Sequence, residues 1–187
     1  MGMPDALEEW TAEAVRALPA DGKRHEAIDG ALLVTPAPSR AHQYAVAALY
    51  ERLAPYVHGN GLGVVTLSPS EIELDPRTLV QPDLFVARLV QGRRPRERRQ
   101  TAVPLLVIEV LSPSTAHDDL HRKRRRYQRA GVAVYWIVDL DDRLVQRWRP
   151  DDERAEILTE SLDWQPDPAR AGLSIGLPEI FAEACDR

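Results

Sequence analysis

The chain has 187 residues, of which 44% are hydrophobic and 28% are charged, and its formal net charge at pH 7 is −5. This length and composition are typical of one globular domain with a buried core, so we expect a single domain over residues 1–187. No apolar run approaches the roughly 20 residues needed to cross a bilayer, and the N-terminus lacks the pattern of a signal peptide. A single cysteine, Cys185, excludes an internal disulfide. We therefore expect a cytoplasmic protein with no membrane partner.

The first part of the chain alternates helical and extended patterns. Residues 5–18 predict a short amphipathic helix. Asp29 and Gly30 then lie between two apolar segments and can supply the positive φ angles of a tight hairpin turn. A second helix is expected over about 40–57, with Ser39 as its N-cap and an apolar stripe at helical spacing.

The middle of the chain predicts a buried strand–helix–strand unit. Short strands are expected over residues 61–87, and the arginine-rich stretch 88–101 predicts an exposed loop. Residues 104–111 read PLLVIEVL, the continuous apolar pattern of a strand that is covered on both faces. A helix capped by Thr115 should run to about Ala130, and a second buried strand, VAVYWIVD, follows it. A crossover of this kind predicts parallel pairing of the two strands.

The remaining segments complete a mixed fold. Residues 144–149, LVQRWR, alternate as a more exposed strand, and a short helix is expected near 178–184. We expect both ends of the chain to belong to the same domain. These ends are residues 1–20, which contain the first helix, and the C-terminal extension 150–187. The order of elements predicts an α/β (α+β) fold with a mixed central β-sheet flanked by helices.

Two isolated carboxylates interrupt apolar strands. Glu109 lies within PLLVIEVL, and Asp83 follows Pro82 at the start of the strand LFVA. A buried carboxylate must be paired, protonated or bound to a metal ion. If the two strands are neighbours, both carboxylates can reach one point and, with backbone carbonyls and water, form a hard-oxygen site for Mg²⁺ or Mn²⁺. The alternative is that each carboxylate pairs with an arginine for structural reasons.

One lysine stands in an arginine-rich helix. Only Lys23 and Lys123 among the 24 basic residues are lysines, and Lys123 lies within RKRRR. An ammonium group can lower its pKa and transfer a proton, which a guanidinium group practically cannot. The alternative is an ion pair between Asp119 and Lys123 at i, i+4 spacing, worth only a few tenths of a kcal/mol. Tyr127 lies one turn further along the same helix face.

A zinc site is a weaker alternative. His117 and His121 are four residues apart on the predicted helix, as in the zinc-protease motif H-E-x-x-H. Asp118 replaces the glutamate of that motif, and its shorter side chain reaches less far as a general base. No third ligand follows at a recognised spacing, and the neighbouring arginines disfavour a dication.

Three stretches together are similar to a known family. They are HEAIDGALLVTPAPSRAHQ, VQPDLFVA and LLVIEVLSPSTAHDDLHRKRRRYQRAGVAVYWIVD, and they resemble the Uma-two family of restriction endonucleases within the PD-(D/E)XK nuclease superfamily. The likeness covers residues 24–182. It implies a restriction-endonuclease-like fold and a metal-dependent endonuclease that hydrolyses phosphodiester bonds of DNA.

The resemblance also implies the site residues. Asp83 matches the aspartate of the PD motif, Glu109 the next acidic residue, and Glu26 a frequent acidic residue near the N-terminus of the fold. The superfamily lysine normally stands two residues after the glutamate, where this chain has Leu111, so Lys123 on the following helix is its match. We expect Asp83, Glu109, Lys123 and Glu26 to be the catalytic residues.

The implied cofactor is Mg²⁺, with Mn²⁺ as an alternative. We expect Asp83, Glu109, the backbone carbonyl of Val110 and Glu26 to bind the metal ion. Lys123 is then expected to orient or deprotonate the attacking water and to stabilise the charge that develops on the phosphate.

Further residues are expected to support this chemistry. His42 matches a recurrent family histidine, and we expect it to support the site together with Tyr127. We expect three arginines of the following helix to bind phosphates next to the scissile bond, namely Arg122, Arg124 and Arg126. DNA is the expected partner, and a homodimer is expected by analogy because two-fold symmetry suits duplex cleavage. The main alternative is a non-catalytic module that binds nucleic acid or protein on a nuclease fold.

Overall fold

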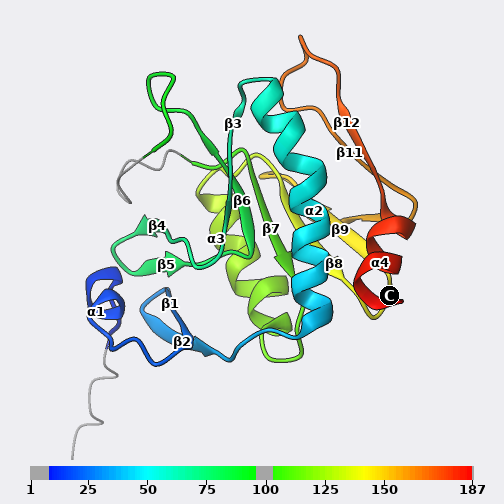
Figure 1. Cartoon of the computed structure of the whole chain (residues 1–187). Coiled ribbons are helices and arrows are strands. Elements are labelled where there is room, and N and C mark those ends of the chain that lie inside the picture. The colour runs from blue at the N-terminus through cyan, green and yellow to red at the C-terminus, as the bar shows by residue number, and fades with distance from the viewer. Residues whose placement is uncertain (1–8, 96–102, 187) are drawn as a thin grey trace, which may run out of the picture.

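The computed structural model describes residues 9–95 and 103–186. At its centre lies a six-stranded sheet in the order β10–β9–β8–β7–β6–β3, in which β7 and β8 are parallel and every other pair is antiparallel (Figure 1). Its strands are β3 (Gly63–Leu67), β6 (Leu84–Arg88), β7 (Leu106–Val110), β8 (Tyr135–Asp139), β9 (Leu144–Trp148) and β10 (Glu156–Leu158). The predicted mixed sheet is confirmed, and so is the predicted parallel pairing of the two strands that precede and follow the helix in the chain.

A second sheet lies against the central one. It has the order β2–β1–β5–β4 and consists of β1 (Arg24–Ile28), β2 (Ala31–Thr35), β4 (Ile72–Asp75) and β5 (Thr78–Val80). The hairpin between β1 and β2 turns at Asp29 and Gly30, which have φ angles of 53° and 81°. The Asp-Gly turn is thus confirmed, and it fixes the register that brings β1 alongside the site.

Helices cover both faces of the central sheet. Helix α2 (Arg40–Gly59) and helix α4 (Leu177–Cys185) lie on one face with the hairpin-like pair β11 (Ser161–Trp164) and β12 (Leu173–Gly176). On the other face lies α3 (Arg124–Arg129), preceded by the π-helix η2 (Asp118–Lys123). The Ser39 side chain accepts a hydrogen bond from the His42 N–H at 3.2 Å and caps α2 as predicted.

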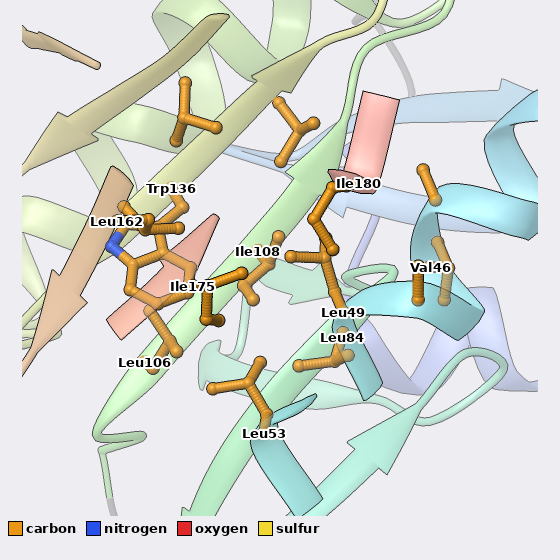
Figure 2. Close-up of a cluster of buried hydrophobic side chains, with 14 of the residues drawn as sticks. Val46, Leu49, Leu53, Leu84, Leu106, Ile108, Trp136, Leu162, Ile175 and Ile180 are labelled. Atoms are coloured by element: carbon orange, nitrogen blue, oxygen red, sulfur yellow. The ribbon is translucent and has the colours of Figure 1, made fainter. Parts of the chain in front are cut away.

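Each face of the sheet has its own hydrophobic core. The main core lies between the sheet, α2, α4 and the β11–β12 pair. Figure 2 shows sheet residues Leu84, Leu106, Ile108 and Trp136 meeting Val46, Leu49, Leu53, Leu162, Ile175 and Ile180. The second core lies between the two sheets and α3, and includes Ile28, Val107 and Tyr127. None of the described helices combines the length and apolar character required to span a bilayer.

Three predicted segments differ from the structure. Within the described ranges the first helix, α1, covers only Ala12–Arg16, because the Trp10 N–H donates to the Gly30 carbonyl at 2.9 Å and holds the preceding segment on the hairpin. Thr115 does not cap the helix before α3, because its hydroxyl lies 2.9 Å from the Ser112 hydroxyl. That helix is π-helical rather than α-helical over η2. Of the predicted loop 88–101, residues 96–101 lie outside the described residues.

The pairing of β3 with β6 leads to a testable prediction. A methyl group at Gly63 would overlap the backbone carbonyl of Ala87, which cannot move without disturbing the ladder. We expect Gly63→Ala to lower the free energy of unfolding by about 1–3 kcal/mol, as overpacking does. Gly59 is the matched control, because a methyl group there meets nothing within 4 Å and replaces glycine in a helix, so Gly59→Ala should be neutral or stabilising. Equal urea midpoints for the two variants would contradict this account.

Candidate functional site

The two carboxylates that interrupt apolar strands point to the same face of the central sheet. Ile108 and Val110, on either side of Glu109 in β7, belong to the main core, so by strand alternation Glu109 points to the opposite face. Leu84, which follows Asp83, belongs to the same core, so Asp83 also faces away from it. Since Leu84 pairs with Ile108 in antiparallel register, Asp83 lies opposite Glu109.

Hydrogen-bond donors surround the carboxylate of Asp83. The Arg24 guanidinium donates to Oδ1 at 2.9 Å, and Nε2 of His42 lies 3.0 Å from Oδ2. The backbone N–H of Val110 donates to Oδ2 at 2.9 Å. The backbone N–H of Asp83 itself donates to Oε2 of Glu109 at 3.3 Å, so the two strand ends are tied to each other through both carboxylates.

These contacts hold Asp83 in its charged form. Burial opposes ionisation, but the hydrogen bond from His42 and the charge of Arg24 outweigh it and lower the pKa of Asp83 to about 2. Burial likewise opposes the charge of Arg24, yet the carboxylates of Asp83, Glu109 and Glu26 outweigh that cost and raise its pKa. The Asp83–Arg24 pair is therefore ionised at neutral pH.

Strand β1 brings a third carboxylate to the site. Arg24, Glu26 and Ile28 alternate onto one face of β1, and Ile28 packs into the core between the two sheets. Glu26 is fully buried, and its Oε1 accepts the backbone N–H of Gln81 at 2.7 Å. Its other oxygen, Oε2, has no hydrogen-bond partner within the part of the chain that the structure describes.

The ammonium of Lys123 lies among three carboxylates. Its Nζ is 3.0 Å from Oε1 of Glu109, 3.1 Å from Oε1 of Glu26 and 3.1 Å from Oδ1 of Asp119. The Lys123 side chain is only 1% exposed. Asp119 and Lys123 both belong to η2, and π-helical turns are rare and occur frequently at functional sites. One lysine thus links β1, β7 and η2.

An excess of buried negative charge perturbs this cluster. Burial lowers the pKa of Lys123, but the charges of Glu109, Glu26 and Asp119 outweigh this effect and raise it well above its usual value. Burial also raises the pKa of Glu109, and the attraction of Lys123 does not cancel that rise. The Tyr127 hydroxyl donates to Oε1 of Glu109 at 3.3 Å, and burial raises the pKa of this tyrosine. Burial therefore favours the protonated form of Glu109.

The donor set can be tested against a divalent cation. Four buried acidic side chains among the described residues, Glu26, Asp83, Glu109 and Asp119, face two permanent cations, Lys123 and Arg24, which leaves an excess of two negative charges. Carboxylate oxygens, one of them unpartnered on Glu26, are the ligands that Mg²⁺ prefers. In ligand type and charge the residues fit a divalent cation. Within residues 9–95 and 103–186, however, no three acidic, histidine or cysteine side chains surround a common metal position.

The site opens to solvent on the Asp83 side. A cavity of about 310 Å³, here called the Asp83 cavity, is lined by Arg24, His42, Gln81 and Asp83 together with Lys23 and others. Neither Glu109 nor Lys123 lines it. Asp83, Arg24 and His42 are therefore the groups that a substrate can meet, while Glu109 and Lys123 lie behind them.

Comparisons with known proteins identify the family and the fold of this chain. The family model Uma2 (Uma-two), described as "Putative restriction endonuclease", matches residues 12–178. The chain belongs to the Uma2 family. A crystal structure described as "a putative nuclease belonging to DUF820" from Anabaena variabilis is similar to this Uma2 protein with a TM-score of 0.77 and 19% sequence identity. The match covers 94% of this chain and 99% of the other, which confirms the restriction-endonuclease-like fold. The search of curated proteins found no match.

In this Uma2 protein, tertiary contacts join the predicted site residues in two groups. The carboxylate of Asp83 contacts His42 and accepts a hydrogen bond from the backbone N–H of Val110. The Val110 group predicted to act at the site, as a metal ligand, is its backbone carbonyl. Lys123 contacts Glu26 and Glu109, and Tyr127 reaches the same cluster. The ion pair between Asp119 and Lys123, the alternative role for this lysine, is present as well. The metal-binding and catalytic roles of these residues stay predictions.

The three arginines predicted to bind phosphate make contacts within the protein, and their phosphate-binding role stays a prediction. Arg122 donates to Asp118 and to the Ile28 carbonyl, and Arg126 pairs with Asp29 and Asp75. Arg124 donates to the Leu120 carbonyl and to Gln128, and its guanidinium lies 4.4 Å from the centre of the Trp148 ring. These contacts favour a structural role, in which the arginines attach the helix to both sheets.

Arg24 and Asp119 belong to the site although no sequence motif indicates them. Arg24 is two residues before Glu26, so the period of two along a strand could have placed both on one face. Asp119 was considered only as an ion-pair partner on an exposed helix face, because nothing in the sequence showed that this face is buried. The rings of His117 and His121 contact each other at a tilt of 60° with their centres 5.1 Å apart, and among the described residues no metal-binding group includes them.

The Lys123 cluster leads to a stability prediction. Replacing Lys123 with methionine leaves three buried carboxylates without their ammonium, so we expect Lys123→Met to cost about 3–5 kcal/mol of unfolding free energy. The protein's other lysine is the matched control. Lys23 is 57% exposed and 3.7 Å from Asp21, so Lys23→Met should change stability by less than about 0.5 kcal/mol. Urea denaturation measures both, and a similar small effect for the two variants would contradict the assignment.

The lowered pKa of Asp83 predicts how its contribution to stability varies with pH. Because the folded pKa, about 2, lies below the usual 3.8, the contribution is complete above the usual pKa and is lost as pH falls toward 2. The difference in unfolding free energy between wild type and Asp83→Asn should be constant from pH 7 to 5 and shrink by about 2 kcal/mol toward pH 2. Urea titrations at several pH values measure this difference. A difference that stays unchanged at low pH would show that the carboxylate is not held ionised.

Proposed function

We propose that this Uma2 protein is a metal-dependent endonuclease that hydrolyses phosphodiester bonds of DNA at Asp83 and Glu109. The observation that carries the proposal is the opposition of these two buried carboxylates at neighbouring strand ends, next to a cavity open to solvent. Membership of a family described as restriction endonucleases supports nucleic acid as the substrate.

The proposed metal ligands are Asp83 and Glu109, with Glu26 nearby and the carbonyl of Val110 as the predicted backbone ligand. Their hard oxygens and their uncompensated negative charge support Mg²⁺, with Mn²⁺ as an alternative. When bound, Mg²⁺ would supply Lewis acidity that lowers the pKa of water and neutralises phosphate charge.

The protein's own residues would divide the remaining tasks. Lys123 lies behind the cavity with its ammonium against three carboxylates, so we assign it a positioning role: it keeps Glu109 and Glu26 in place despite their mutual repulsion. His42 holds Oδ2 of Asp83 at 3.0 Å and lines the cavity, so it orients Asp83 toward the substrate. Both roles require the rigid strand ends that β6 and β7 provide.

A plasmid-cleavage assay with Mg²⁺ tests the proposed activity. Asp83→Ala and Glu109→Gln should each lower the cleavage rate at least about 100-fold, because a metal ligand supplies several kcal/mol of transition-state stabilisation. Asp167→Asn is the matched control, since Asp167 is a surface residue paired with Arg170 and should leave cleavage unchanged. Omitting Mg²⁺ should abolish cleavage. Cleavage that persists in Asp83→Ala would rule out this site.

One observation favours a non-catalytic binding module as the second candidate. Asp83 is already paired with Arg24 and His42, and Glu109 with Lys123, so side-chain cations compensate part of the negative charge without a metal ion. The same assay separates the candidates, because a binding module would retain DNA binding in a gel-shift experiment and show no metal-dependent cleavage. Two-fold pairing of the protein, which suits duplex cleavage, also stays a prediction and can be measured by analytical ultracentrifugation.

A further inference from the structure

Two cavities meet at the exposed edge of the site. The first is the Asp83 cavity. The second, of about 720 Å³, is here called the Ser112 cavity and is lined by Ser112 and Ser114 after β7, by Asp139 at the end of β8, and by other residues. Arg24 and His42 line both cavities, together with residues 36–38. A ligand in either cavity therefore meets the same two side chains, which are also the two that hold Asp83.

Two of the three guanidinium nitrogens of Arg24 have no hydrogen-bond acceptor among the described residues. Its Nη1 donates both to the Gln81 carbonyl at 2.8 Å and to Oδ1 of Asp83 at 2.9 Å. Among the described residues no atom accepts a hydrogen bond from its Nε or Nη2, and the side chain is 14% exposed. A guanidinium group presents its donors as a planar fork that matches the oxygens of a phosphate.

The Nε2 nitrogen of His42 is the second donor at this junction, and Asp83 engages it. Its side chain is 5% exposed, and while Nε2 contacts Asp83, its Nδ1 is buried without a partner in the described part of the chain. His42 belongs to the first turn of α2, a helix of 20 residues, and Ser39 and Ala41 of the same turn line the Ser112 cavity. The positive end of the helix dipole therefore faces this cavity, as at many phosphate sites.

Charges of both signs surround the junction. Lys23 lines the Asp83 cavity and adds a positive charge. Asp139 and Asp141 line the Ser112 cavity, and Oδ1 of Asp139 accepts hydrogen bonds from the N–H groups of Asp141 and Asp142 in the adjacent turn, each at 3.0 Å. Lys123, the cation predicted to act on the substrate, lines neither cavity.

We propose that Arg24 and His42 form a binding site for a phosphate group where the two cavities meet, and that Asp83 occupies these donors when no phosphate is bound. This proposal rests on the proposed function in one respect only, the identity of the natural ligand, which would be the phosphate backbone of a nucleic acid. Arg24, rather than Lys123 or the arginines of the helix, is then the cation that contacts the substrate. Asp83 acts as an internal competitor for that cation.

Binding to metal-free protein tests this site independently of cleavage. Titration calorimetry in low-salt buffer with EDTA would use two probes, inorganic phosphate and a short single-stranded thymidine oligonucleotide. Arg24→Gln should weaken binding about tenfold, the loss expected for a charge-assisted hydrogen bond. Arg170→Gln removes an equal charge from an exposed arginine and should bind as wild type does. Tighter binding of the oligonucleotide than of phosphate would identify the nucleic-acid backbone as the ligand, and the reverse would identify free phosphate.

A second variant probes the competition directly and leaves Arg24 in place. Asp83→Asn removes the charge that engages Arg24 and His42, so it should bind phosphate several-fold more tightly although it is expected to lose cleavage. Arg24→Lys keeps the charge but not the planar fork, and should bind weakly while remaining folded by circular dichroism. The site is disproved if wild type binds neither probe, if Arg24→Gln binds as wild type does, or if Asp83→Asn binds no more tightly. None of these results depends on whether the protein cleaves DNA.

Discussion

The structure depends on one buried ammonium group. Lys123 brings together carboxylates from β1, β7 and η2, each about 3 Å from its Nζ. Buried carboxylates are costly unless they are paired, so the lysine stabilises the packing of these three segments against one another. An arginine would fill this position poorly, because its planar fork cannot point donors at three carboxylates arranged around one point. This geometry explains why the chain departs from arginine here.

The site has an inner and an outer layer. In the inner layer, Lys123 compensates carboxylates that are closed off from solvent. In the outer layer, Arg24 and His42 line both cavities and hold Asp83, which lines the Asp83 cavity. The layers meet where the N–H of Asp83 donates to Glu109. Chemistry at Asp83 can therefore respond to a ligand in the cavities, while the inner layer keeps Glu109 fixed.

The family assignment and the site geometry address different questions. Membership of the Uma2 family and the likeness to the Anabaena variabilis structure establish a nuclease-type fold. Whether the fold is used for cleavage depends on how the excess negative charge of the site is compensated, by side-chain cations, a proton on Glu109 or a divalent ion. The carboxylates could serve any of these, because a buried acidic cluster accepts each kind of positive charge.

Local patterns in the sequence determined many of the elements. The Asp29–Gly30 turn, the Ser39 cap of α2 and the continuous apolar run around Glu109 each follow from the conformational preferences of a few adjacent residues. The family motifs likewise identified Asp83 and Glu109. These features need no information about distant parts of the chain, and so they could be recognised without a structure.

Only the tertiary structure decided how the site is assembled. The pairing of Leu84 with Ile108 sets Asp83 opposite Glu109, and a shift of one residue would have sent one of them to the other face. The face of η2 that carries Asp119 and Lys123 could not be recognised as buried, because charged residues at helical spacing usually mark a solvated surface. Burial and register arise from contacts between segments far apart in sequence. For that reason the partners of Lys123, and the position of Arg24 at the junction of the cavities, became visible only in the folded chain.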